Sequence, residues 1–235
     1  MNVLAIETSA IYCSIAVFKD GQIFFKEDTN KSQHGKVILA LIDELLDQSQ
    51  LSLEQLDKIL ISYGPGSFTG LRIGCGVAQS FNLIHRIKCF GISSLKVLAS
   101  TAYQNELKGK LVCLISLGMG EFAASKFDDK ESLLDNKTEE FILQNEDLAT
   151  FLKEHKDYHV ITSSENTDMM NILKSKNFSF IQPEAKSMFE FITISDVASP
   201  QGDRFIVPNY LSNNCLLYTS PSPRDRTRSR MPSSA

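Results

Sequence analysis

A glycine-dense block at residues 64–74 constrains this chain more than any other stretch. It follows a short apolar run at residues 58–63 and precedes a helical pattern, so it predicts a strand, a tight turn and the start of a helix. Glycine lets another segment or a ligand come close, and a proline between two glycines stiffens the turn. The motif comprises Gly64, Pro65, Gly66, Ser67, Phe68, Thr69, Gly70, Leu71, Arg72 and Gly74.

Two interpretations of this block stay open. Ser67 and Thr69 can cap the helix, and the free amides of a helix N-terminus can bind phosphate. The block does not match the nucleotide loop G-x-x-x-x-G-K-[ST], because Gly70 is followed by Leu71 and Arg72. The sequence therefore favours a structural turn over a phosphate site.

Composition indicates an ordinary globular protein. The chain has 235 residues, 43% of them hydrophobic and 22% charged. No apolar run approaches the roughly 20 residues that span a bilayer, and the N-terminus lacks a signal-peptide pattern. The five cysteines form no C-x-x-C pair, which is typical of free thiols in a reducing cytoplasm. We expect a cytoplasmic protein with no membrane contact.

Residues 215–235 have a different character. They hold four arginines, one acid and three prolines without periodicity, whereas the whole chain has a net charge of −4. A basic arm for nucleic acid is one interpretation. The abrupt change after residue 214 favours a non-native tail, which we expect to be disordered and exclude from functional reasoning.

Hydrophobic periodicity predicts an α/β chain with two lobes of mixed sheets. Strands are expected at 3–9, 12–18, 22–26, 58–63 and 88–92, with helices at 34–48, 70–86 and 94–105. A looser second unit has strands at 111–117, 121–127, 140–143 and 159–162, a charged loop at 128–136, and helices at 145–154, 166–174 and 185–197. We place the lobes at residues 1–106 and 107–214, before the 215–235 tail.

Two helices are candidates for a partner interface. The helix at 34–48 carries an apolar stripe that Val37 and Leu39 widen, and the helix at 70–86 carries small residues every four positions. Burial inside the chain's own lobe and contact with a partner are both open. The predicted interface comprises His34, Ile38, Leu41, Ile42, Leu45, Gly70, Gly74, Ala78 and Phe81.

Three segments together resemble the TsaB (YeaZ) family. Proteins of this family are subunits of the bacterial tRNA threonylcarbamoyladenosine (t6A) machinery. They are residues 5–9, 64–74 and 91–95, and the similarity is close over 1–105 and weaker to about residue 213. The resemblance implies an actin-like (ASKHA) two-lobe fold, with mixed β-sheets flanked by helices, and a non-catalytic role. It also implies pairing with TsaD, association with the ATPase TsaE, and homodimers when TsaD is absent.

The same resemblance implies what the complex does. It transfers a threonylcarbamoyl group to N6 of adenosine 37 in tRNAs that read ANN codons. No cofactor is expected on this chain, because ATP and a metal would belong to the partner subunits. We expect tRNA to bind through the complex, since residues 1–214 are acidic and phosphate contacts dominate such affinity.

Two departures from related sequences bear on this expectation. TsaD-like relatives hold a metal partly through an H-x-x-x-H pair, and the aligned positions here are Ser94 and Leu98. TsaB-like chains usually have an acidic-Ala-Arg run where this chain has Ser116, Leu117 and Gly118. The H-x-x-x-H at His155 and His159 straddles a predicted helix end and strand, so we interpret it as a chance match.

The alternative hypothesis is an independent ATP-binding enzyme of the sugar- or acetate-kinase type. Its weak candidates for cofactor binding are Glu7, Thr8 and Ser9, which end the first strand as the acid and hydroxyls of such enzymes do. A carboxylate there could hold Mg²⁺ through water while glycine amides support phosphates. A metallopeptidase is a third hypothesis with little support.

Overall fold

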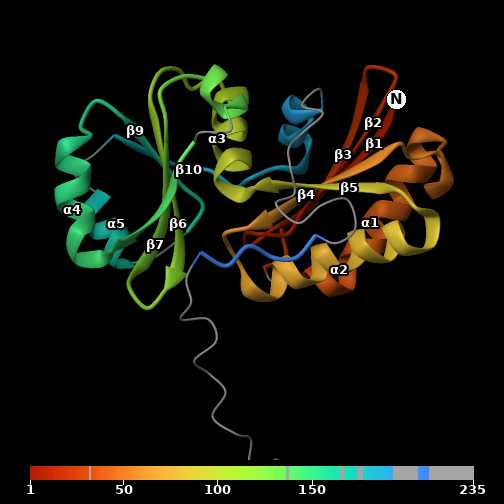
Figure 1. Ribbon diagram of the computed structural model, residues 1–235, viewed down its shortest axis with the longest axis horizontal. Helices are drawn as coiled ribbons and strands as arrows, with labels where there is room; N and C mark the ends of the chain where they lie inside the picture. Colours follow the sequence, from red (N-terminus) through yellow and green to blue (C-terminus); the bar gives the residue numbers. More distant parts are fainter. Residues whose placement is uncertain (32, 136–137, 165–166, 174–176, 193–205, 212–235) are drawn as a thin grey trace, which may run out of the picture.

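Two five-stranded mixed sheets form the molecule, each flanked by helices (Figure 1). The computed structural model describes residues 1–31, 33–135, 138–164, 167–173, 177–192 and 206–211. No helix in these ranges is long and apolar enough to cross a membrane. The predicted tail at 215–235 lies outside the described residues.

The first sheet has the order β3-β2-β1-β4-β5. Its strands are β1 (Asn2–Glu7), β2 (Cys13–Lys19), β3 (Gln22–Asp28), β4 (Lys58–Gly64) and β5 (Lys88–Ser93). Strands β1, β2 and β3 pair antiparallel, whereas β4 and β5 run parallel to β1. The parallel strands need crossover connections, and helices supply them.

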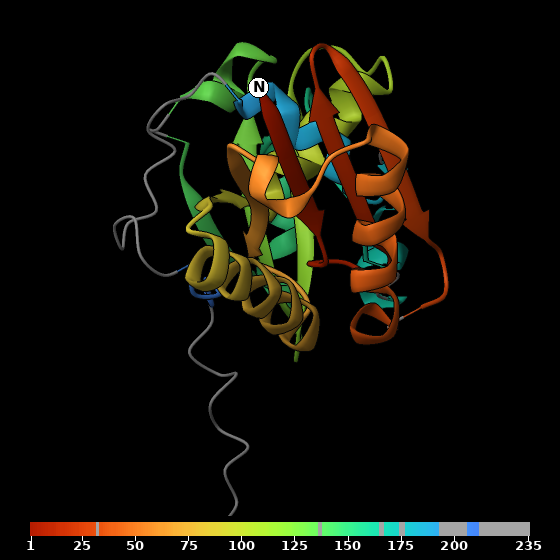
Figure 2. The same cartoon turned by 90° about the vertical axis from the view of Figure 1, so that its right-hand side faces the viewer.

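Two helices cover one face of this sheet and lie side by side in Figure 2. They are α1 (His34–Ser49) and α2 (Phe68–His85), and the short 3-10 helix η1 (Leu53–Gln55) precedes β4. Side chains of a strand alternate between faces, so Leu4 and Ile6 of β1 pack toward α1 and α2 while Val3 and Ala5 pack the other way.

The second sheet has the order β10-β9-β6-β7-β8. It consists of β6 (Leu111–Gly118), β7 (Glu121–Phe127), β8 (Glu140–Gln144), β9 (His159–Thr162) and β10 (Phe178–Phe180). Helices α4 (Asn145–Glu154) and α5 (Thr167–Leu173) cover its outer face. The 3-10 helix η2 (Glu131–Leu134) lies between β7 and β8, inside the predicted charged loop.

A single hydrophobic cluster joins the two sheets. Helix α3 (Ser94–Gln104) and the 3-10 helix η3 (Ala185–Phe191) lie between them, as Figure 1 shows. Leu95 and Leu98 of α3 belong to the same cluster as Val3 of the first sheet and Leu111 of the second. Around α3 and η3, the space between the lobes is therefore packed with apolar side chains. Whether residues 1–106 and 107–214 are separate folding units stays a prediction.

The element predictions need two corrections. Strand β10 was not predicted, because its three residues are too few for an alternating pattern. The helix expected at 185–197 is the 3-10 helix η3, which ends at Phe191, and residues 193–197 lie outside the described residues. Side-chain oxygens of Thr101 and Ser14 accept the amides of Glu184 and Ala185, which fixes the start of η3 against the core.

We expect the shared cluster to make both lobes unfold together. Leu98 is fully buried in it, so Leu98→Ala should lower the free energy of unfolding by about 2–5 kcal/mol in one cooperative transition. Leu83→Ala is the matched control, because Leu83 is 77% exposed and its truncation should change stability by about 0.5 kcal/mol or less. Urea denaturation followed by circular dichroism measures both. Two separate transitions in the unsubstituted chain would contradict this expectation.

Candidate functional site

The glycine block forms the turn between β4 and α2. It contains a cis Gly64–Pro65 peptide bond, and Ser67 is the N-cap of α2. The Ser67 hydroxyl oxygen accepts a hydrogen bond from the amide of Gly70 at 3.2 Å, as expected for a cap. The block lies beside the end of β1. The glycine block and the candidate residues Glu7, Thr8 and Ser9 therefore meet in space.

Close packing explains the glycines of this block. A Cβ on Gly70 would lie 2.0 Å from the carbonyl oxygen of Thr8, and a Cβ on Gly74 would lie 2.3 Å from its Oγ1. At Gly66, a Cβ would lie 2.3 Å from the carbonyl oxygen of Ser9. No side chain fits at such distances. The turn after β1 therefore rests directly on the small face of α2.

Two backbone amides that could bind an anion at this turn already donate hydrogen bonds within the chain. The Ser67 amide donates to the carbonyl oxygen of Ser9 at 2.7 Å, and the Gly70 amide donates to the Ser67 side chain. A phosphate at this turn would have to displace both bonds. The geometry thus favours the structural interpretation of the glycine block.

Glu7, Thr8 and Ser9 are all buried. The amide and the hydroxyl of Ser9 both donate to Oε1 of Glu7, at 2.6 and 2.5 Å. Burial raises the pKa of Glu7 to about 7, and hydrogen bonds from Ser9 and Ser62 oppose this only in part. The structure brings these three candidates to the glycine block, but it encloses their side chains in protein.

The interface prediction needs a correction at the level of residues. Four predicted contact residues, Ile38, Ile42, Leu45 and Ala78, are at most 2% exposed in the chain's own core. The apolar stripe that is clearest in the sequence therefore packs on the chain's own sheet and is not free for a partner. Gly70 and Gly74 face Thr8, as described above.

The remaining predicted contact residues also have partners within the chain. Nε2 of His34 lies 3.0 Å from the carbonyl oxygen of Ala10. Leu41 and Phe81 are half-buried against the core. Only these two of the predicted side chains therefore present apolar surface on α1 and α2.

Other apolar residues of α1 and α2 face outward. Leu39 of α1 is 55% exposed, and Leu83 and Ile84 of α2 are 77% and 70% exposed. A Cβ on Gly35 would lie 3.5 Å from Cδ1 of Ile73, so the first turn of α1 meets α2 directly. The predicted interface set left out these three residues, Leu39, Leu83 and Ile84, which we call the outer face of α1 and α2, although Leu39 was recognised in the sequence as widening the apolar stripe.

A small cavity lies between the lobes beside the glycine block. Its volume is about 260 Å³, and the described residues that line it carry no charged side chain. It brings the altered turn at Ser116, Leu117 and Gly118 next to Pro65 and Phe68, with the segment 209–211 as a third wall. The Arg72 guanidinium stacks on the Phe68 ring at 3.5 Å, which makes this the aromatic end of α2.

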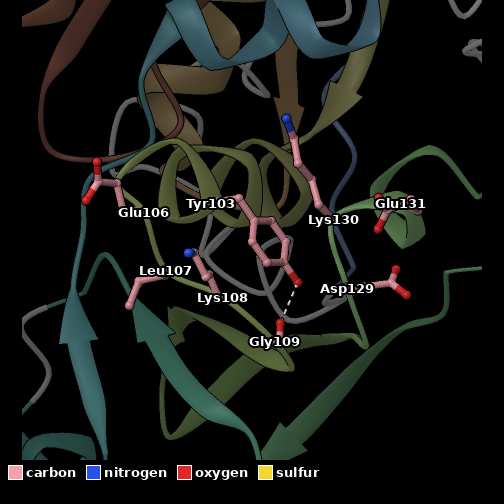
Figure 3. Close-up of a pocket in the computed structure, with 8 residues that line it drawn as sticks. All are labelled: Tyr103, Glu106, Leu107, Lys108, Gly109, Asp129, Lys130 and Glu131. Carbon is pink, nitrogen blue, oxygen red and sulfur yellow. Dashed lines mark hydrogen bonds between the residues drawn. The ribbon is translucent and has the colours of Figure 1, made fainter.

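A larger and more charged pocket of about 650 Å³ lies at the far end of α3 (Figure 3). Its walls carry acids and lysines of both flanking loops, and none of the predicted site residues is among them. The Tyr103 hydroxyl donates to the carbonyl oxygen of Gly109 at 2.9 Å, and Lys130 pairs with Glu190 at 2.8 Å. The first bond ties the end of α3 to the loop that follows it, and the second ties the loop at Lys130 to η3.

The two positions aligned with metal ligands of TsaD-like relatives, and the two histidines of the H-x-x-x-H match, make contacts within the chain. Ser94 Oγ lies 2.7 Å from Ser62 Oγ, and Leu98 is fully buried in the interlobe cluster. His155 Nδ1 lies 2.9 Å from the Phe151 carbonyl oxygen, and His159 Nε2 lies 2.9 Å from Ser179 Oγ. Among the described residues, no group of three His, Cys, Asp or Glu side chains could hold a metal ion.

The two sheets with helices around them define the actin-like two-lobe class. The family model described as "TsaD: tRNA N6-adenosine threonylcarbamoyltransferase" matches residues 28–206. The structure of YeaZ from Pseudomonas aeruginosa is similar with a TM-score of 0.76 and 21% identity, covering 89% of this chain and 99% of that one. This structural likeness establishes the fold.

Sequence comparison resolves the family further. The chain is 31% identical to the tRNA threonylcarbamoyladenosine biosynthesis protein TsaB of Buchnera aphidicola subsp. Schizaphis graminum, covering 81% of this chain and 92% of that protein. It is also 31% identical to TsaB of Escherichia coli, over 56% of this chain and 57% of that protein. The chain belongs to the TsaB family.

A matched pair of glycine substitutions tests the packing of α2. Gly74→Ala places a methyl group against Thr8, so we expect a loss of stability of about 1–3 kcal/mol. Gly76→Ala lies two residues further along the same helix with nothing within 4 Å, and should stabilise the chain by about 0.5–1 kcal/mol. Thermal unfolding compares them. Equal effects of the two substitutions would show that Gly74 is not in close contact.

Proposed function

We propose that this chain is the TsaB subunit of a cytoplasmic t6A-forming complex. In this role it pairs with TsaD and supports transfer of a threonylcarbamoyl group to N6 of adenosine 37, without being the catalyst. The observation that carries the proposal is the similarity to a TsaB protein over 92% of that relative's length. ATP, metal and tRNA would then be handled by the complex and its other subunits, including the ATPase TsaE.

The packing between the lobes supports a non-catalytic role. Enzymes that close two lobes around a substrate need a cleft and a hinge. Here α3 and η3 fill the space between the sheets, and Leu95 and Leu98 are completely buried there. Substrate-driven closure would have to break this core. Ser94 and Leu98, which align with the metal ligands of TsaD-like relatives, are likewise buried in the interior.

The outer face of α1 and α2 is our proposed partner surface. Exposed apolar side chains that gather on one face typically mark protein–protein contacts. Leu39 lies on α1, and Leu83 and Ile84 lie on α2, and these two helices are neighbours on the first sheet. We propose that TsaD covers this face, and that a second copy of the chain covers it when TsaD is absent.

A charge on this face should abolish pairing without unfolding the chain. We expect Ile84→Asp to weaken association with TsaD at least 100-fold, because it buries an unpaired carboxylate in the contact. Leu134→Asp is the matched control, since Leu134 is 42% exposed on the second lobe. Light scattering on mixtures of the full chain with TsaD from the same organism measures pairing. If Ile84→Asp pairs with TsaD as well as the unsubstituted chain does, the partner surface lies elsewhere on the molecule.

The alternative kinase hypothesis has a separate readout. If the well-folded chain formed no complex with TsaD and bound ATP with micromolar affinity, the independent enzyme would replace the subunit as our proposal. The internal hydrogen bonds of the Ser67 and Gly70 amides weigh against that outcome.

A further inference from the structure

Helix α1 carries three charged side chains in one line on its exposed side. Lys36, Asp43 and Asp47 are all exposed, and their spacing places them within about 40° of one another around the helix. We call these three residues the charged line. Ala40 is exposed within the line, and Leu39 of the outer face lies beside it. The line is therefore positive near the start of α1, uncharged in the middle and negative toward the end.

The charged line is arranged against the helix dipole. The start of an α-helix carries a partial positive charge and its end a partial negative charge, so acids stabilise the first turn and bases stabilise the last. Helix α1, which is described throughout, has no acid in its first turn, where Lys36 lies, and no base in its last turn, where Asp47 lies. Asp43 and Asp47 are also four residues apart, and like charges at this spacing repel each other. These charges therefore destabilise the helix that carries them.

The described part of the chain supplies no counterion for the charged line. None of its three side chains makes a hydrogen bond or an ion pair with a described residue. Two lysines of the first sheet reach α1, but they bind other groups. Lys26 pairs with Glu44, and Lys19 donates to the carbonyl oxygen of Ser49 at 2.7 Å. Seven residues of a helix span about 10 Å, so the two ends of the line cannot pair with each other.

A second copy of the chain carries the complementary charges. If two copies pack α1 against α1 about a two-fold axis perpendicular to the helix, the helices run antiparallel and the positive end of each line faces the negative end of the other. An axis at Ala40 places Lys36 of one copy opposite the turn between Asp43 and Asp47 of the second copy. The small side chain of Ala40 permits close approach at this axis. A parallel arrangement would instead bring like charges together and align the two helix dipoles unfavourably.

We propose that Lys36, Asp43 and Asp47 select the orientation in which a second copy of the chain docks on the outer face. The two copies pack α1 antiparallel to α1, and Lys36 of each copy pairs with Asp43 and Asp47 of the other. The proposal rests on the proposed function, in which the outer face is the partner surface. It adds which residues select the orientation, and it explains why α1 retains charges that destabilise it.

Two charge reversals test this orientation. Lys36→Glu places like charges opposite each other at both ends of the paired helices, and so does Asp43→Lys combined with Asp47→Lys. We expect each variant to self-associate about 10-fold more weakly than the unsubstituted chain. A mixture of the two variants should associate as tightly as the unsubstituted chain, because every lysine of the line then faces an acid. Analytical ultracentrifugation of the full chain measures all four samples, and a mixture no tighter than its components would overturn the proposal.

Lys156→Glu is the matched control for the net charge. Lys156 is exposed on the second lobe, and its reversal changes the charge of the chain as much as Lys36→Glu does. It should leave self-association unchanged. Added salt tests the sign of the contact, because screening weakens the attraction between opposite charges. Self-association of the unsubstituted chain should therefore weaken as salt is raised, and an increase with salt would overturn the proposal.

Thermal unfolding separates a loss of association from a loss of folding. Lys36→Glu places an acid in the first turn of α1, and Asp47→Lys places a base in the last turn. Both variants should therefore unfold at a temperature about 1–3 °C higher than the unsubstituted chain, at a dilution where all are monomeric. Weaker self-association of a more stable monomer is the expected combination, and damage to the fold does not produce it.

A measurement on the unsubstituted chain covers the case in which a variant does not fold. A carbodiimide joins a lysine amine to a carboxylate only where the two groups are in contact. In a mixture of isotopically light and heavy chains, mass spectrometry should find Lys36 joined to Asp43 or Asp47 in peptides that contain one light and one heavy part. Cross-links between copies that leave out Lys36 would overturn the proposal.

The outcomes distinguish this proposal from the proposed function. If Ile84→Asp abolishes self-association while both charge variants retain it, the outer face stands as the partner surface and the proposed orientation is wrong. If the unsubstituted chain stays monomeric at its highest soluble concentration but pairs with TsaD, the proposal fails and the proposed function stands. If the charge variants behave as expected but the chain does not pair with TsaD, only the proposed function fails.

Discussion

The backbone contact between Thr8 and Gly70 is the constraint on which the rest of this structure depends. It needs a residue without a side chain on α2, because any Cβ would lie 2.0 Å from the Thr8 carbonyl oxygen. With this contact made, α2 lies tightly over the end of β1, and the Ser67 amide reaches Ser9. The Glu7 side chain at the end of the same strand is also fully buried. A motif that looks like a ligand loop is therefore satisfied by its own chain.

The second determinant is the apolar cluster between the sheets. In a two-lobe fold a substrate would enter between the lobes, but here Leu98 and its neighbours occupy most of that space and leave a small cavity of about 260 Å³ beside the glycine block. Burying each such side chain contributes about 1.5–3 kcal/mol, so opening the lobes would expose a large share of the core. A rigid body with an apolar outer face on α1 and α2 suits a subunit whose role is to hold a partner.

Helices α1 and α2 show why an interface is hard to identify from periodicity. An amphipathic helix that covers a sheet packs its clearest apolar stripe against that sheet. Here Ile38, Ile42 and Leu45 form that stripe. The residues left for a partner are the additional ones, such as Leu39 and Ile84, which widen the stripe beyond what the sheet covers. The sequence showed that Val37 and Leu39 widen the stripe, but it did not show that Leu39 is left exposed while Ile38 and Ile42 are buried.

The sequence by itself determined the local structure and the family. Alternation and helical spacing depend on neighbouring residues, so β7, α4 and β9 have the predicted bounds, and the residues of the glycine block are specific enough to indicate TsaB-like relatives. Only the tertiary structure decided what those residues do. In the sequence Glu7 is a weak candidate ligand, but in the fold its carboxyl is buried, accepts hydrogen bonds from Ser9 and lies close to Ser62, which is 55 positions away. Burial depends on contacts between distant segments, and no local pattern encodes them.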